Sequence, residues 1–188
     1  HLAGLPAAID SFLEEHILAS AHLRITVAGE AAGFASIHQE RLITQFALRE
    51  PQKRHGQRIF ALLRRAEQVQ SAFVPTCDEF YLAHALDDYR QLAKQAHFFA
   101  APDPAPPPTI PAGFTLQVAG PADAALIREH SGEFFGAVEG HIAARELFVA
   151  RRHGEPVGFG IAERSALYEA VASIGMFTIE RFRRDGVG

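Results

Sequence analysis

The sequence predicts an α+β fold built as two successive units, each a mixed, mostly antiparallel sheet flanked by helices. Three observations support this prediction. The 188 residues are 48% hydrophobic and 21% charged, which is the balance of a globular chain that can bury a core. A proline-rich segment divides the chain. The same order of helices and strands, with a short repeated motif, occurs on both sides of that segment.

The division falls at residues 101–113, which hold six of the eleven prolines. Such a run forms neither a helix nor a central strand, because proline lacks an N–H and fixes φ. It favours an extended, semi-rigid spacer. We therefore predict an N-terminal unit at 1–100, a linker at 101–113 and a second unit at 114–188.

The first unit is predicted to open with a helix, because Ile9, Phe12, Leu13 and Ile17 recur on one helical face. Glu50-Pro51 is predicted to end a buried strand. The elements after the first helix are predicted as strands at 22–28, 32–38 and 41–48, a helix at 54–67, a strand at 70–75, a helix at 78–92 and a strand at 94–100.

The second unit is predicted to repeat part of this order. Its elements are a strand at 114–118, a helix at 122–135, a hairpin of strands at 146–152 and 157–164, a buried strand at 171–179 and a loop at 183–188 that starts a helix.

The two units also share a short motif. Residues 29–34 read G-E-A-A-G-F, and residues 154–159 read G-E-P-V-G-F. A glycine loop follows each motif, around Gly56 and Gly186. A match of this length arises by chance between hairpins, but its place in the same element order favours an internal duplication.

The glycine loops carry the functional interpretation. A buried strand followed by a basic glycine loop and a helix is typical of an anion site, because the first N–H groups of a helix lack partners and the helix dipole adds positive charge. Glycine lets a phosphate approach the backbone. The second unit offers Arg183, Arg184, Gly186 and Gly188, and the first unit offers residues 53–58.

These residues resemble the pyrophosphate loop of the GNAT superfamily of N-acetyltransferases, which reads Gln/Arg-x-x-Gly-x-Gly/Ala. Arg183, Gly186 and Gly188 match it in the second unit. Lys53 and Gly56 match it in the first unit, with Arg54 beside them, whereas Arg58 stands where the family has a small residue. The resemblance covers nearly the whole chain in element order, and its motifs are short.

The resemblance implies a fold, a cosubstrate and site residues. Acetyl-CoA would be the donor, with its pantetheine arm along Met176, Phe177 and Thr178. Glu169, just before that strand, is the candidate general base. Tyr89 is the candidate acid for the departing thiolate. The alternative for Glu169 is a solvated loop residue without a catalytic role. The alternative for Tyr89 is an aromatic residue at a helix end that packs on the core with its hydroxyl in solvent.

Two further residues are substrate candidates. Glu139 and His141 precede a strand in a region that often forms the acceptor pocket in this family. The predicted partners are a small-molecule or peptide amine and, as an open alternative, a second copy of the chain in a homodimer. The acceptor itself cannot be read from the sequence, because acceptor loops vary on a shared fold.

Other constellations favour plainer interpretations. His84, Asp87 and Asp88 could ligate a metal by residue type, but further ligands are not evident nearby, so no metal is expected. Cys77 precedes a helix, but Asp78 and Glu79 beside it oppose a reactive thiolate.

Composition excludes several classes of function. The net charge is −4, so a nucleic-acid surface is not expected. No apolar run approaches the roughly 20 residues of a membrane span. One cysteine and no visible signal peptide favour a cytoplasmic location, although the chain begins at His1 rather than methionine.

Two hypotheses from different classes remain. In the first, the protein is an N-acetyltransferase whose second unit is catalytic. In the second, it is an inactive GNAT-like binding or dimerisation module, which Arg58 and the end of the chain inside the second loop both favour. A different α+β fold is the third alternative.

Overall fold

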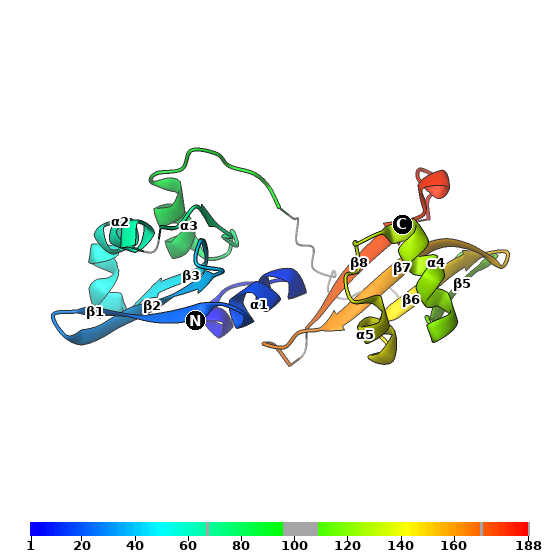
Figure 1. The fold of residues 1–188 in the computed structure, drawn as a ribbon, viewed down its shortest axis with the longest axis horizontal. Coiled ribbons are helices and arrows are strands. Elements are labelled where there is room, and N and C mark those ends of the chain that lie inside the picture. The colour runs from blue at the N-terminus through cyan, green and yellow to red at the C-terminus, as the bar shows by residue number, and fades with distance from the viewer. Residues whose placement is uncertain (67, 96–108, 170, 188) are drawn as a thin grey trace. The chain divides into compact units, whose positions relative to one another are not determined.

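The computed structural model describes residues 1–66, 68–95, 109–169 and 171–187, and the chain forms two compact units (Figure 1). Unit 1 comprises His1–Phe99 together with Ala166–Glu169. Unit 2 comprises Ala100–Ser165 and Ala170–Gly188. Each unit holds one four-stranded sheet with its own helices, which confirms the predicted α+β class.

Unit 1 has a sheet in the order β1-β2-β3-β4, in which β1, β2 and β3 are antiparallel and β4 pairs parallel to β3. The strands are β1 (Ala21–Val27), β2 (Glu30–His38), β3 (Leu42–Leu48) and β4 (Ser71–Ala72). The helices are α1 (Ser11–Leu18), α2 (Gly56–Ala66) and α3 (Glu79–Leu86), with 3₁₀ helices at Leu2–Gly4 and Glu50–His55.

Two helices of unit 1 begin where the sequence supplies a cap. The side chain of Asp10 accepts a hydrogen bond from the N–H of Leu13 at the start of α1, and Asp78 accepts one from Tyr81 at the start of α3. Such caps satisfy backbone N–H groups that the helix itself leaves open. Burial raises the pKa of Asp78, while its bond from the Tyr81 N–H and the nearby Lys53 oppose that shift.

Unit 2 has a purely antiparallel sheet in the order β5-β6-β7-β8. The strands are β5 (Phe114–Val118), β6 (Leu147–Arg152), β7 (Glu155–Arg164) and β8 (Ala172–Thr178). The helices are α4 (Ala124–Ser131) and α5 (Val138–Ala143), with 3₁₀ helices at Pro121–Asp123 and Glu180–Phe182.

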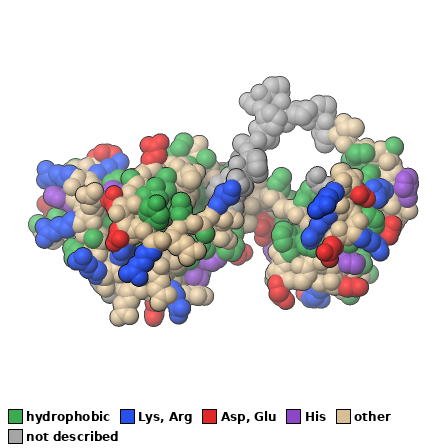
Figure 2. Space-filling view, turned by 90° about the horizontal axis from the view of Figure 1, so that it is seen from above, with side chains coloured by type: hydrophobic (Ala, Val, Ile, Leu, Met, Phe, Trp, Pro, Cys, Tyr) green, Lys and Arg blue, Asp and Glu red, His purple; other side chains and the backbone are tan. Residues whose placement is uncertain are grey.

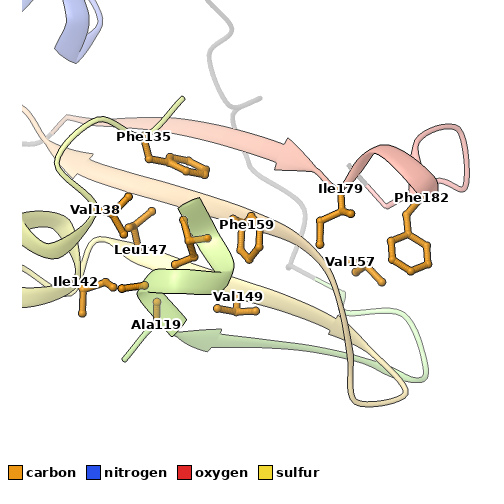
Figure 3. Packing of buried hydrophobic residues seen from close by; sticks show 12 residues of the cluster. Ala119, Phe135, Val138, Ile142, Leu147, Val149, Val157, Phe159, Ile179 and Phe182 are labelled. Carbon is orange, nitrogen blue, oxygen red and sulfur yellow. The ribbon is translucent and has the colours of Figure 1, made fainter. Parts of the chain in front are cut away.

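The core of unit 2 lies between this sheet and its two helices. Phe159 and Val149 are buried on the sheet face that α4 and α5 cover, and Val138 and Ile142 meet them from α5 (Figure 3). Because successive side chains of a strand point to opposite faces of the sheet, the residues next to these core positions lie on the other face. Val118, Phe148, Gly160 and Met176 form one row across all four strands there.

The glycine of the repeated motif has the same packing role in both units. A Cβ built on Gly33 would lie 2.1 Å from the carbonyl oxygen of Ala47 on the neighbouring strand. A Cβ on Gly158 would lie 2.8 Å from the carbonyl oxygen of Phe177. Real Cβ atoms essentially never come within 3.0 Å of another heavy atom in this way, so the shared motif marks a close approach of backbones.

Several predicted bounds are corrected. The helix predicted at 122–135 is α4 followed by a break at Gly132 and Gly136, both with positive φ, and then by α5, which was not predicted. The helix predicted at 78–92 ends at Leu86. The strand predicted at 70–75 is only two residues long, and Lys94 and Gln95 lie in no strand. The rest of the strand predicted at 94–100 lies outside the described residues.

The surface mixes charges of both signs. Figure 2 shows lysine and arginine side chains interspersed with aspartate and glutamate on both units, on the face in view. None of the described helices has the length and apolar character that crossing a bilayer requires.

Candidate functional site

The basic loop of unit 1 lies between β3 and α2, as the sequence predicts, but its amides are already used. The 3₁₀ helix Glu50–His55 runs directly into α2, so the helical segment begins at Glu50. The N–H of Gln52 donates to the carbonyl of Arg49 at 2.8 Å, and the N–H of Gly56 donates to Lys53. An anion at Lys53, Arg54 and Gly56 would therefore find few open donors.

The side chains of this loop also have partners. The ammonium group of Lys53 pairs with the carboxylate of Glu50 and lies 5.6 Å from the centre of the Phe80 ring. The Arg54 Nε donates to His55 at 3.1 Å. With these contacts, the side chains of Lys53 and Arg54 are already engaged within unit 1.

Gly56 is required for helix packing. A Cβ at this position would lie 2.0 Å from the Nε2 atom of His84 in α3. The His84 ring is held in turn, because its Nδ1 lies 2.7 Å from the carbonyl oxygen of Phe80 and its face meets the rings of Phe46 and Phe60. The missing side chain at Gly56 makes room for an imidazole.

This contact gives a first prediction. Gly56→Ala is expected to lower the free energy of unfolding of unit 1 by about 1–3 kcal/mol, the usual range for overpacking. In a His84→Ala background the same change should instead stabilise the protein, by up to about 1 kcal/mol, because alanine is the better helix former. Urea denaturation of the four proteins measures the coupling. Equal effects in both backgrounds would show that His84 does not constrain Gly56.

Unit 1 contains a fork between β3 and β4. The two parallel strands pair only at Leu42 with Ser71 and at Ile43 with Ala72. Tyr81 of α3 occupies the fork: its hydroxyl donates to the carbonyl of Ile43 at 2.9 Å, and its side chain is fully buried. Burial, and after it the charge of Asp78, raise the pKa of Tyr81 well above its ordinary value. The hydroxyl therefore stays protonated and bonded.

Tyr89, which the sequence analysis gives as the candidate acid, is not the tyrosine in this fork. Because α3 ends at Leu86, Tyr89 lies beyond the helix and is 57% exposed. Tyr81 lies three residues after Asp78, which caps α3. This spacing from a helix cap was the sequence feature that could have placed Tyr81 in the first turn of the helix. A pocket lined by residues of α2 and by His84, Asp87 and Asp88 has a volume of about 70 Å³. Pockets for drug-sized ligands hold roughly 300–1,000 Å³.

In unit 2, β8 is the strand that the basic glycine loop follows, as β3 is in unit 1. Among the described residues β8 pairs only with β7, so its other edge is open. The N–H of Ile179 donates to Val157 at 3.0 Å. Hydrogen-bonding groups alternate along an antiparallel pair, so the N–H and C=O groups of Met176 and Thr178 point to the open side. In agreement, the carbonyl of Thr178 accepts from Arg183 Nε at 3.3 Å. Phe177 points instead into the core.

The loop after β8 differs from the loop of unit 1. Arg184 and Gly186 both have positive φ, 74° and 68°. Among the described residues, no backbone carbonyl accepts from the N–H of either residue. A Cβ on Gly186 would meet nothing within 4 Å, so this glycine serves the backbone conformation rather than packing. The carboxylate of Asp185 pairs with Arg152 at 3.4 Å.

The structure does not bring the remaining predicted residues together. Gly188 lies outside the described residues. Glu169 is an exposed turn residue that groups with unit 1, whereas Met176 and Thr178 belong to unit 2. Glu139 forms an exposed ion pair with Arg128 of α4. His141 lies against two other carboxylates, Glu146 and Glu163.

In both units, a four-stranded sheet has a basic glycine loop after one of its strands, β3 in unit 1 and β8 in unit 2, as the resemblance to the acetyltransferases predicts. The family comparison agrees. Residues 1–101 match the family described as "Acetyltransferase (GNAT) domain". The chain therefore belongs to the GNAT acetyltransferase family.

The fold is also similar to that of a solved structure, an acetyltransferase from the GNAT family of Colwellia psychrerythraea. The TM-score is 0.72 and the identity 18%, over 99% of this chain and 74% of that chain. At this identity the likeness concerns the fold. A search of the curated proteins finds no match.

Proposed function

We propose that the protein is an N-acetyltransferase that moves an acetyl group from acetyl-CoA to the amine of an acceptor, with the donor bound to unit 2. The supporting observation is the continuous run from the open edge of β8 into the loop at 183–187. The N–H and C=O groups of Met176 and the N–H of Thr178, on the open side of β8, would face the two amides of the pantetheine arm, while the Thr178 carbonyl would keep its bond from Arg183. The open amides of Arg184 and Gly186 would face the diphosphate.

The charge of this loop suits a diphosphate. Arg183 and Arg184 are both exposed, and the nearby carboxylate of Asp185 is partly neutralised by Arg152. Arginine with open backbone N–H groups is the donor set that phosphate oxygens prefer. The reaction would then form a bond between the amine nitrogen and the acetyl carbon and break the bond from that carbon to sulfur. The amine proton would leave to a base or to water, and the thiolate would be protonated as it departs.

Donor binding by the whole chain gives the second prediction. A donor at 100 times its dissociation constant should add about 2.7 kcal/mol to the free energy of unfolding. Arg183→Ala should weaken acetyl-CoA binding by roughly 10-fold or more, because it removes a charge-assisted hydrogen bond. Calorimetric titration with acetyl-CoA measures the dissociation constant, and urea denaturation with and without acetyl-CoA measures the added stability.

Arg181→Ala is the matched control. This arginine lies two residues away and is exposed, but it pairs with Glu155 at 2.6 Å and is not part of the loop. Its removal should leave the dissociation constant within about twofold, since exposed ion pairs contribute little. The proposal fails if saturating acetyl-CoA neither binds nor stabilises the chain, or if Arg181→Ala and Arg183→Ala weaken binding equally.

One observation favours a second function for part of the chain. The fork in unit 1 is filled by Tyr81 and its basic loop is closed by backbone bonds, so unit 1 would serve as a GNAT-shaped scaffold that binds no donor. In that case, titration should give one acetyl-CoA per chain, and the dissociation constant should be unchanged in Lys53→Ala. A stoichiometry of two would exclude the scaffold role.

A further inference from the structure

Three side chains that can ligate a metal lie close together in unit 2, where α5 leads into β6. They are His141 of α5, Glu146 in the turn before β6, and Glu163 near the end of β7. His141 Nδ1 lies 2.9 Å from Glu146 Oε2, and His141 Nε2 lies 3.7 Å from Glu163 Oε1. One ligand atom from each residue can be chosen so that all lie within 4.8 Å of one another.

The backbone fixes this arrangement. α5 ends with Arg145 in the left-handed region, at φ 61°. The N–H of Glu146 donates back to the carbonyl of His141 at 2.9 Å, and the N–H of Arg145 donates to Ile142 at 3.0 Å. These two bonds make a Schellman motif, which brings Glu146 against His141. The N–H of Ala162 donates to the carbonyl of Glu146 at 2.9 Å, so the next residue, Glu163, is held beside both.

The cluster combines one imidazole with two carboxylates, which are ligand types that divalent zinc binds. The three side chains are only 19–25% exposed, so water compensates them incompletely. Carboxylates in such a partly buried position are costly unless they are paired or coordinate a metal. A divalent cation would offset both carboxylates and leave the imidazole neutral, which is the form that binds metals.

We propose that His141, Glu146 and Glu163 bind one Zn²⁺ ion through one imidazole nitrogen and two carboxylate oxygens. Zinc–nitrogen and zinc–oxygen bonds are about 2.0–2.2 Å long, so tetrahedral ligand atoms lie about 3.4 Å apart. The separation of 3.7 Å between His141 Nε2 and Glu163 Oε1 is close to that value. The Glu146 carboxylate now lies against Nδ1 of His141, and rotation of its side chain would bring it in as the third ligand. The partial exposure of the cluster would leave a fourth position for water.

Zinc binding can be tested on the whole chain, independently of acetyl transfer. After treatment with a chelator, the protein is titrated with Zn²⁺ by calorimetry, and Co²⁺ absorption is recorded as a second readout. We expect one tight site per chain. His141→Ala should weaken Zn²⁺ binding by about 100-fold, and Glu163→Gln by at least about 10-fold, since even an outer-shell partner changes affinity 10- to 100-fold.

His153→Ala and Glu155→Gln are the matched controls, because His153 lies in the β6–β7 turn and Glu155 begins β7, both in the same unit and outside the cluster. Both should bind Zn²⁺ as the original chain does. Circular dichroism checks that His141→Ala is folded, and Glu163→Gln with the Co²⁺ spectrum decides the question if it is not. The proposal is overturned if the original chain has no tight site, or if the controls lose as much affinity as the cluster variants.

Discussion

Replacing Tyr81 with alanine is expected to lower the free energy of unfolding of unit 1 by about 3–5 kcal/mol, the range for truncating a buried aromatic side chain. The ring is fully buried and lies 6.1 Å from the Phe60 ring and 6.5 Å from the Phe46 ring, between centroids. Its removal leaves a cavity in the fork between β3 and β4. Urea denaturation followed by circular dichroism measures the loss, and amide exchange in β3 localises it.

Two further variants separate packing from hydrogen bonding at this position. Tyr81→Phe keeps the ring and should cost only about 1 kcal/mol, because the carbonyl of Ile43 still accepts the N–H of Phe73 at 2.9 Å. Tyr89→Ala removes the exposed tyrosine and should stay within about 0.5 kcal/mol of the original chain. If Tyr81→Ala were as stable as Tyr89→Ala, Tyr81 would not fill the fork.

Adding one methyl group at Gly33 is expected to cost about 3 kcal/mol, the upper end of the range for overpacking. The new Cβ would lie 2.1 Å from the carbonyl oxygen of Ala47 and 2.9 Å from the Cα of Leu48. Both are backbone atoms of β3, so no rotamer change relieves the clash and the two strands must separate. The midpoint of urea denaturation measures the effect.

The second sheet supplies a graded comparison for Gly33→Ala. Gly158→Ala places its Cβ 2.8 Å from the carbonyl oxygen of Phe177 and should cost less, about 1–2 kcal/mol. Gly160→Ala places its Cβ 3.8 Å from the carbonyl oxygen of Gly175, which is ordinary contact, and should be nearly neutral. An order of stability that does not follow these distances would contradict the explanation of the repeated glycine.

Local patterns determined much of the fold. β3 (Leu42–Leu48) and β6 (Leu147–Arg152) lie within one residue of their predicted bounds, because apolar runs and turn residues are read from neighbouring positions. The short helix α5 escaped prediction, because six residues carry too little periodicity. The helix predicted at 78–92 ran too far, because it was continued through Asp87 and Asp88, and aspartate is among the weaker helix formers.

The candidate sites were harder to predict, because their properties arise from tertiary contacts. Nothing near Gly56 in the sequence indicates that His84, 28 positions later, occupies the space beside it. Likewise, no metal was expected from the spacing of His84, Asp87 and Asp88, whereas His141 meets Glu163 only because a sheet and a helix end bring them together. The basic glycine loops could be recognised in the sequence. Whether their N–H groups are bonded depends on the local backbone, which is a 3₁₀ helix at Glu50–His55 in unit 1 and a turn with positive φ at Arg184 and Gly186 in unit 2.

The row of side chains on the face of the second sheet opposite α4 and α5 has a chemical consequence. It contains Met176, the single methionine of the chain, with 54% of its surface exposed. Peroxide converts an accessible thioether to the sulfoxide, which adds one oxygen to the mass of the protein. The rate of that conversion therefore reports, without any label, whether this face of β8 is open to solvent or covered.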